Sequence, residues 1–152
     1  MSDAKGLVEL LRQRTLTVAA AESCTGGAFM AALVRVPGAS EVLRGGVVAY
    51  SLDAKVKQLG VNLKTIERHG AVSEQVAAEM AVGVKKTLGA DIGVGITGFA
   101  GPSGERVGEI CFAVSIGGQT FPMKKNFPGL SREEVIDASV NFLLQWLCEK
   151  LL

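Results

Sequence analysis

The sequence has few of the residues from which metal sites, disulfide frameworks and nucleic-acid-binding surfaces are built. Its 152 residues include one histidine and three cysteines, and the cysteines show neither close pairing nor metal-ligand spacing. Acidic and basic residues nearly balance, with 16 Lys and Arg against 15 Asp and Glu, so a footprint for nucleic acid or an anionic membrane is missing. We therefore expect no metal, no nucleic-acid partner, and buried free thiols in a reducing cytoplasm.

Long apolar runs are also missing. No uninterrupted apolar segment reaches membrane-spanning length. The polar start, Met1–Gly6, lacks the apolar core of a signal peptide. About half of the residues (48%) are hydrophobic and 20% are charged, which is typical of a globular domain. Because no repeat, linker or shift in composition divides the chain, we expect one cytoplasmic domain over residues 1–152.

Predicted strands and helices alternate along the first two thirds of the chain. Apolar runs at 15–21, 46–50 and 91–97 predict buried strands. Gly117-Gly118 separates segments 109–116 and 120–127, which predicts a hairpin. This order predicts an α/β sandwich with a mixed sheet. Cap and stop residues predict helices over 3–14, 25–36, 52–59, 63–69, 74–88 and about 131–151.

A serine lies where a predicted strand turns into a predicted helix. The segment Ala21–Gly27 (AESCTGG) follows an apolar run and precedes another. Glycines permit a tight turn, and free N–H groups at a helix start can hold a negative oxygen. The arrangement suits a nucleophile, Ser23, beside an oxyanion hole formed around Thr25, Gly26 and Gly27. The alternative is that Ser23 is a helix N-cap.

A second candidate group follows the strand at 46–50. Tyr50 ends this strand, and Lys55 lies near the start of the next predicted helix. The positive end of the helix dipole and partial burial both favour a neutral amine, and a neutral lysine can act as a general base. The alternatives are a solvated Lys55, like its neighbour Lys57, and a purely structural Tyr50.

The single histidine, His69, is placed at a predicted helix end before Gly70, where a capping role is the better interpretation. Lys55 is therefore the simpler base for Ser23, and Ser-Lys pairs are a known variant of the serine-nucleophile arrangement.

A glycine-rich loop follows the strand predicted at 91–97. The segment Gly95–Gly104 (GITGFAGPSG) lies where ligands bind in open α/β sheets, and its N–H groups could cradle a phosphate. It has neither the P-loop nor the Rossmann spacing. The alternative is an ordinary connector.

Together these segments resemble the CinA C-terminal domain family, whose members include nicotinamide-nucleotide amidohydrolases. The resemblance spans about residues 5–150. Larger relatives carry a further N-terminal domain, and we expect this chain to be a stand-alone form. The motifs that carry the resemblance are AESCTGG at 21–27, GVVAYS at 46–51 with Ala54-Lys55, HGAVS at 69–73, GITG at 95–98 with Gly101-Pro102, Val107-Gly108, and Phe127-Pro128-Gly129.

The resemblance implies a three-layer α/β/α sandwich with a mostly parallel sheet. It also implies hydrolysis of the carboxamide of nicotinamide mononucleotide to nicotinic acid mononucleotide and ammonia, as part of pyridine nucleotide salvage. The nucleophile, its base and an assisting tyrosine map to Ser23, Lys55 and Tyr50, and no cofactor is implied. Further substrate contacts are expected at Thr97, Gly98 and Gly101.

Two departures from the family pattern concern the substrate. The segment Gly104–Gly108 is short and lacks a Lys-Pro pair, so Arg106 is the candidate substitute for the lysine. Arg132 matches the first of two family arginines, whereas Ile136 occupies the second position. The alternatives are therefore a hydrolase of another small amide, or a non-catalytic nucleotide-binding or regulatory module. The apolar helix at 142–147 fits either the core or a homo-oligomer contact.

Overall fold

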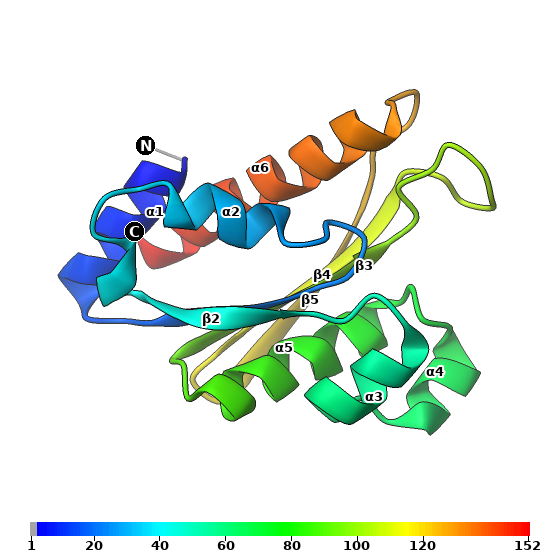
Figure 1. The fold of residues 1–152 in the computed structure, drawn as a ribbon, viewed down its shortest axis with the longest axis horizontal. Coiled ribbons are helices and arrows are strands. Elements are labelled where there is room, and N and C mark those ends of the chain that lie inside the picture. The colour runs from blue at the N-terminus through cyan, green and yellow to red at the C-terminus, as the bar shows by residue number, and fades with distance from the viewer. Residues whose placement is uncertain (1–2) are drawn as a thin grey trace.

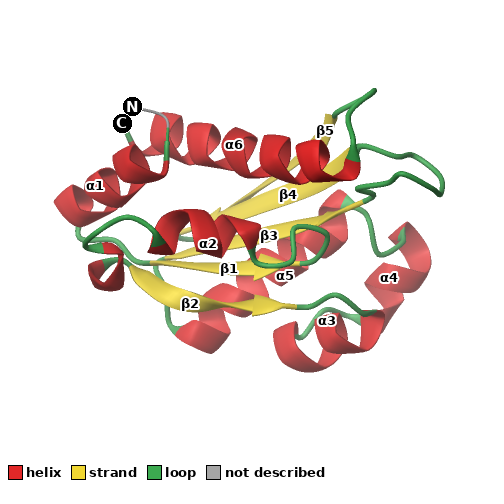
Figure 2. Ribbon diagram, turned by 45° about the horizontal axis from the view of Figure 1, so that its top comes forward, coloured by secondary structure: helices red, strands yellow, loops and turns green. Residues whose placement is uncertain are grey.

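A five-stranded sheet lies between two layers of helices (Figure 1, Figure 2). The computed structural model describes residues 3–152, so the first two residues of the polar start lie outside it. The strand order is β2-β1-β3-β4-β5, in which β2, β1 and β3 are parallel and the β4–β5 hairpin is antiparallel. The predicted α/β fold with a mixed sheet is confirmed. The strands are β1 (Val18–Glu22), β2 (Leu43–Val48), β3 (Ile92–Gly98), β4 (Glu109–Ile116) and β5 (Gln119–Asn126).

Each face of the sheet is covered by three helices, which gives the three layers seen in Figure 1. One layer holds α1 (Ala4–Arg14), α2 (Ala28–Val34) and α6 (Arg132–Leu151), and the other holds α3 (Leu52–Leu59), α4 (Leu63–His69) and α5 (Glu74–Leu88). Both faces of β1 are buried, so its apolar residues are continuous instead of alternating. Within residues 3–152, no helix is both long and apolar enough to cross a membrane.

Capping residues mark the ends of α3, α4 and α5. The Ser51 and Ser73 hydroxyls accept hydrogen bonds from N–H groups in the first turns of α3 and α5. Asn62 caps α4 in the same way. Gly60 and Gly89 end α3 and α5 in the left-handed conformation that glycine adopts without steric cost. All five positions agree with the sequence prediction.

Three predicted elements differ from the structure. The strand predicted at 15–21 runs over Val18–Glu22, because Thr15 ends α1 in the left-handed conformation. The helix predicted at 25–36 begins only at Ala28, because Gly26 and Gly27 have φ angles of 57° and 104° and form a turn instead. The strand predicted at 46–50 runs over Leu43–Val48 and is not buried; it is an edge strand whose residues alternate between half-buried and exposed. Sequence pattern alone does not tell an edge strand from a central one.

Candidate active site

Ser23 directly follows β1 at the edge of the sheet where the parallel strands end. Its N–H donates a hydrogen bond to the Ile96 carbonyl of β3 (3.0 Å). On the other side, the Ala49 N–H donates to the Glu22 carbonyl (2.8 Å), which ties the segment after β2 to the end of β1. The peptide group between Glu22 and Ser23 is therefore fixed on both of its polar atoms by neighbouring chain segments.

Lys55 of α3 reaches this edge from the helical layer. Its Nζ atom donates hydrogen bonds to Ser23 Oγ (2.9 Å) and to the Ala49 carbonyl (3.0 Å). Lys55 is only 3% exposed. The alternative of a solvated Lys55 is wrong, whereas Lys57 does have that environment, with a side chain 69% exposed and paired with Asp53 at 3.3 Å.

Burial lowers the pKa of the Lys55 amine below its ordinary value of 10.5, because removal from water disfavours the charged form. A thiolate at Cys24 would oppose this shift. Burial raises the pKa of the Cys24 thiol to about 12, so the thiol is uncharged at neutral pH and supplies no counter-charge. A neutral Lys55 can reverse its hydrogen bond to Ser23 and accept the hydroxyl proton, while one N–H still donates to Ala49.

A buried carboxylate occupies the start of α2. Glu22 is 1% exposed, and its Oε1 atom accepts hydrogen bonds from Thr25 Oγ1 (2.6 Å), the Gly27 N–H (3.2 Å) and the Phe29 N–H (3.0 Å). Its Oε2 atom accepts from the Met30 N–H (3.0 Å). The N-cap position of α2 is Gly27, which has no side-chain cap, so the alternative that Ser23 caps this helix is wrong.

Some backbone N–H groups of the turn after Ser23 donate to acceptors within the protein, and others do not. Gly26 N–H donates to the Ser23 carbonyl (3.0 Å), and Gly27 N–H donates to Glu22. Neither glycine is therefore free to donate to an oxyanion, in contrast to the sequence prediction. Within residues 3–152, neither the Cys24 N–H nor the Thr25 N–H donates to another residue, and the Cys24 N–H lies within reach of its own thiol sulfur. Of the three predicted positions only Thr25 offers a free donor, and Cys24 adds a second.

Tyr50 lies beside the site but does not reach the Ser-Lys pair. It is 60% exposed, and in the described part of the chain its hydroxyl is bonded to Arg132 Nη2 (2.9 Å) and not to Ser23 or Lys55. Arg132 Nη1 also donates to the Gly101 carbonyl (2.6 Å). Arg132, from the first turn of α6, thus connects the segment after β2 with the glycine-rich loop.

The end of β3 is built around a buried threonine. Thr97 directly follows Ile96, which pairs with Glu22 at the end of the β1–β3 ladder, and its hydroxyl donates to the Ala71 carbonyl before α5 (2.9 Å). Because its proton is engaged, the Thr97 hydroxyl can offer a ligand only its acceptor lone pairs. Gly98 is required by packing, since a Cβ atom there would collide with Ile110.

Arg106 is held by the protein itself. Its guanidinium pairs with Glu109 (3.1 Å) and lies over the Phe99 ring at 4.9 Å from the ring centroid. Glu105 adds a longer ion pair of 3.9 Å. The predicted phosphate contact at Arg106 would therefore compete with two carboxylates.

A shallow hollow of about 500 Å³ lies at the start of α6 and is lined by Ser131, Arg132, Glu133 and Ile136. Ile136, the position of the absent family arginine, thus lies in the same hollow as Arg132. The first turn of α6 also carries Glu133 and Glu134, whose charges disfavour an anion. Within residues 3–152, His, Cys, Asp and Glu side chains form no group of three that could hold a metal ion.

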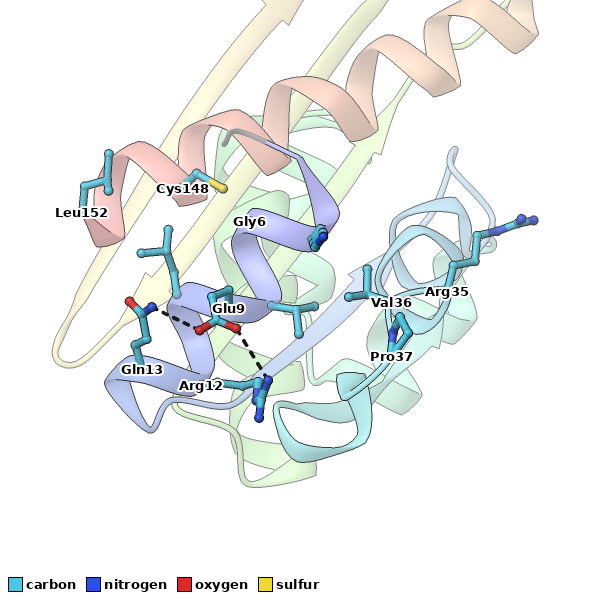
Figure 3. A pocket seen from close by; sticks show the side chains of 12 residues that line it. Gly6, Glu9, Arg12, Gln13, Arg35, Val36, Pro37, Cys148 and Leu152 are labelled. Carbon is cyan, nitrogen blue, oxygen red and sulfur yellow. Dashed lines mark hydrogen bonds and ion pairs between the residues drawn. The ribbon is translucent and has the colours of Figure 1, made fainter.

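A larger cavity, of about 830 Å³, lies away from Ser23, between α1, the segment after α2 and the end of α6. Figure 3 shows Arg12 turned toward Glu9, and the two side chains are 3.5 Å apart. A second ion pair joins Arg12 to Glu41 (2.8 Å). Of the three basic residues that line this cavity, Lys5, Arg12 and Arg35, Arg12 is therefore already paired with carboxylates.

Comparison with known proteins identifies the family. The sequence matches the CinA C-terminal domain over residues 2–151. A CinA-like protein from Kosmotoga olearia is 43% identical over 150 residues, which are 96% of this chain and 36% of that protein. The chain belongs to the CinA C-terminal domain family.

Solved structures agree with this assignment. A CinA superfamily protein from Klebsiella pneumoniae has a TM-score of 0.94 at 36% identity, and the match covers 97% of this chain and 94% of that one. A competence or damage-inducible protein from Enterobacter asburiae has a TM-score of 0.94 at 37% identity, covering 98% and 96%. The chain spans about a third of the length of the curated relatives it matches. Their descriptions refer to CinA and to competence damage, and name no reaction.

Proposed function

We propose that this chain is a serine-type amidohydrolase that converts nicotinamide mononucleotide and water to nicotinic acid mononucleotide and ammonia. The observation that carries the proposal is the buried 2.9 Å hydrogen bond between Lys55 Nζ and Ser23 Oγ. A hydroxyl nucleophile needs a base within hydrogen-bonding reach, and a lysine whose pKa is lowered by burial is such a base.

The first half-reaction forms an ester on the serine. Neutral Lys55 accepts the proton of Ser23 Oγ as the oxygen attacks the carboxamide carbon. The free N–H groups of Cys24 and Thr25 stabilise the negative oxygen of the tetrahedral intermediate; removing one such donor typically costs about 3–4 kcal/mol. Lys55 then gives its proton to the amide nitrogen, and ammonia leaves as the C–N bond breaks. This geometry favours Lys55 over Tyr50 as the group that protonates the leaving nitrogen.

The second half-reaction releases the acid. Lys55, neutral again, takes a proton from water, and the resulting hydroxide attacks the ester carbon. The Ser23 Oγ–carbon bond breaks, and the proton returns from Lys55 to Ser23. No redox change occurs, and water is the only co-reactant.

A second candidate function is hydrolysis of a different small amide by the same pair. The ion pairs of Arg106 and the apolar Ile136 at the hollow beside Arg132 favour it, because both reduce the positive charge available to a phosphate. A non-catalytic nucleotide-binding or regulatory role is the third alternative from the sequence.

Ammonia release distinguishes these functions. The purified chain is assayed with nicotinamide mononucleotide, its riboside, nicotinamide and a panel of small aliphatic amides, with Ser23→Ala as the matched control. We expect the nucleotide to have the highest kcat/KM. Preference for another amide would favour the second candidate, and no activity on any amide would favour a binding module.

A further inference from the structure

The carboxylate of Glu22 is buried at the turn that follows Ser23. It accepts one hydroxyl and three backbone N–H groups, all from the turn after Ser23 and the first residues of α2. A buried carboxylate is stable only when it is paired or well hydrogen-bonded. Four donors and the positive end of the α2 dipole satisfy this requirement.

Glu22 also lies on the strand side of the nucleophile. It is the last residue of β1, its backbone carbonyl accepts from Ala49 N–H, and the next residue is Ser23. One side chain therefore joins the rigid strand before Ser23 to the helix after it. Loss of this link would free the turn that contains the Cys24 and Thr25 N–H groups without touching Ser23 or Lys55.

We propose that Glu22 is a positioning residue for acyl transfer. Its carboxylate accepts hydrogen bonds from N–H groups at the start of α2. It thereby fixes the turn in which the Cys24 and Thr25 N–H groups stay free to bind the oxyanion. This inference rests on the proposed function. It also has a consequence for the substrate: the start of α2 carries a negative charge and no free N–H, so a substrate phosphate binds elsewhere.

The test is the kinetics of Glu22→Gln. The amide oxygen can keep the contacts of Oε1, whereas its NH₂ group faces the Met30 N–H and the negative charge is lost. Because oxyanion contacts are made only in the transition state, we expect kcat to fall about 10-fold to 100-fold with KM within about twofold of wild type. The midpoint of the pH–rate profile, which reports Lys55, should not move.

Asp3→Asn is the matched control. The Asp3 carboxylate accepts from the Gly6 N–H (2.8 Å) at the start of α1, so this variant also converts a helix-capping acid to an amide. It should retain wild-type kcat. Labelling of Ser23 with a fluorophosphonate is carried to completion, so that mass spectrometry counts the sites with an intact nucleophile whatever their rate of reaction.

Two results for Glu22→Gln would overturn the inference: a wild-type kcat, or a loss that equals the loss of fluorophosphonate-reactive sites, which would indicate a purely structural role. If the variant does not fold, Thr25→Val and Thr25→Ser replace it. Only the valine variant removes the 2.6 Å bond to Glu22, so Thr25→Val should be severalfold slower than Thr25→Ser. Equal rates would contradict the proposal.

Failure of the proposed function gives a different pattern. If the wild type reacts with the fluorophosphonate but does not hydrolyse the nucleotide, only the substrate is wrong. The rate of Ser23 phosphonylation, which uses the same oxyanion donors, then replaces kcat in the comparison. A wild type that shows neither reaction would overturn both proposals.

Discussion

Arg132 Nη2 donates a 2.9 Å hydrogen bond to the hydroxyl of Tyr50, 82 residues earlier in the chain. The bond joins the start of α6, on one face of the sheet, to the segment that follows the edge strand β2. Through its second nitrogen, Arg132 also holds the Gly101 carbonyl. One guanidinium therefore connects the segment after β2 with the glycine-rich loop.

This arrangement predicts that Tyr50→Phe affects substrate binding more than chemistry. Without the hydroxyl, Arg132 loses one of its two fixed partners, so we expect KM to rise severalfold while kcat changes less than about threefold. Tyr50→Phe and Arg132→Ala should be non-additive in a double-mutant cycle, because they act through one contact. A kcat loss of 100-fold or more in Tyr50→Phe would instead support the assisting role in catalysis that the family resemblance implies for Tyr50.

Ser23→Ala should abolish amide hydrolysis and leave the fold intact, because it removes only the nucleophilic oxygen. The comparison variant is Asn62→Ala, which removes a true helix cap: its side chain accepts from the Lys64 N–H (2.9 Å). That variant should lose about 1 kcal/mol of unfolding free energy and keep its activity. Ammonia release and thermal unfolding are measured for both. Activity retained by Ser23→Ala would exclude it as the nucleophile.

Lys55→Arg should be nearly as inactive as Lys55→Ala. Arginine keeps the positive charge but does not lose a proton at working pH, so it cannot act as the base. Lys57→Arg provides the matched control, since the Lys57 side chain is exposed and should tolerate the change. Steady-state kinetics of the three variants test this assignment, and a near-normal rate for Lys55→Arg would rule out the general-base role.

The pH dependence should reflect the lowered pKa of Lys55. The pH–rate profile is expected to rise as the ammonium loses its proton, with a midpoint below 10.5. Stability should follow the same group. Between the lowered folded pKa and 10.5, the unfolded chain binds more protons, so the unfolding free energy of the wild type relative to Lys55→Met should increase with pH. Denaturant unfolding across this range tests the sign, and a decrease would contradict the burial effect.

Phosphate recognition can be tested with matched substrates. If the phosphate is held near the segment 97–104 with help from Arg106 or Arg132, the nucleotide should be preferred over its riboside by about 10-fold to 100-fold. This range corresponds to about 1.5–3 kcal/mol for one charge-assisted contact. Arg106→Ala and Arg132→Ala should each raise KM for the nucleotide more than for the riboside.

A variant that adds a positive charge gives a further test of phosphate recognition. Ile136→Arg places a cation in the hollow beside Arg132 and should increase the nucleotide preference further. Equal use of nucleotide and riboside by the wild type would show that the chain does not recognise phosphate, and would favour another amide as the substrate.

The sequence by itself determined the elements and the position of the reactive turn. Caps such as Ser51 and Asn62, and the hairpin at Gly117-Gly118, act through hydrogen bonds within a few residues, so the local sequence is sufficient to place them. The strand-to-helix turn at Ser23 was predictable for the same reason. The predicted helix start at residue 25 was wrong because the side chain of Glu22 and two left-handed glycines define the turn.

Only the tertiary structure decided which residues meet. The contact of Lys55 with Ser23 depends on where α3 packs against the end of β1, and burial, not helix position alone, accounts for the lowered pKa of Lys55. The same holds for Arg132, whose partners come from two distant loops. Such contacts depend on strand order and layer packing, which are long-range properties that no local pattern encodes. The proposed oxyanion donors likewise depend on which N–H groups the folded chain leaves without another residue as acceptor.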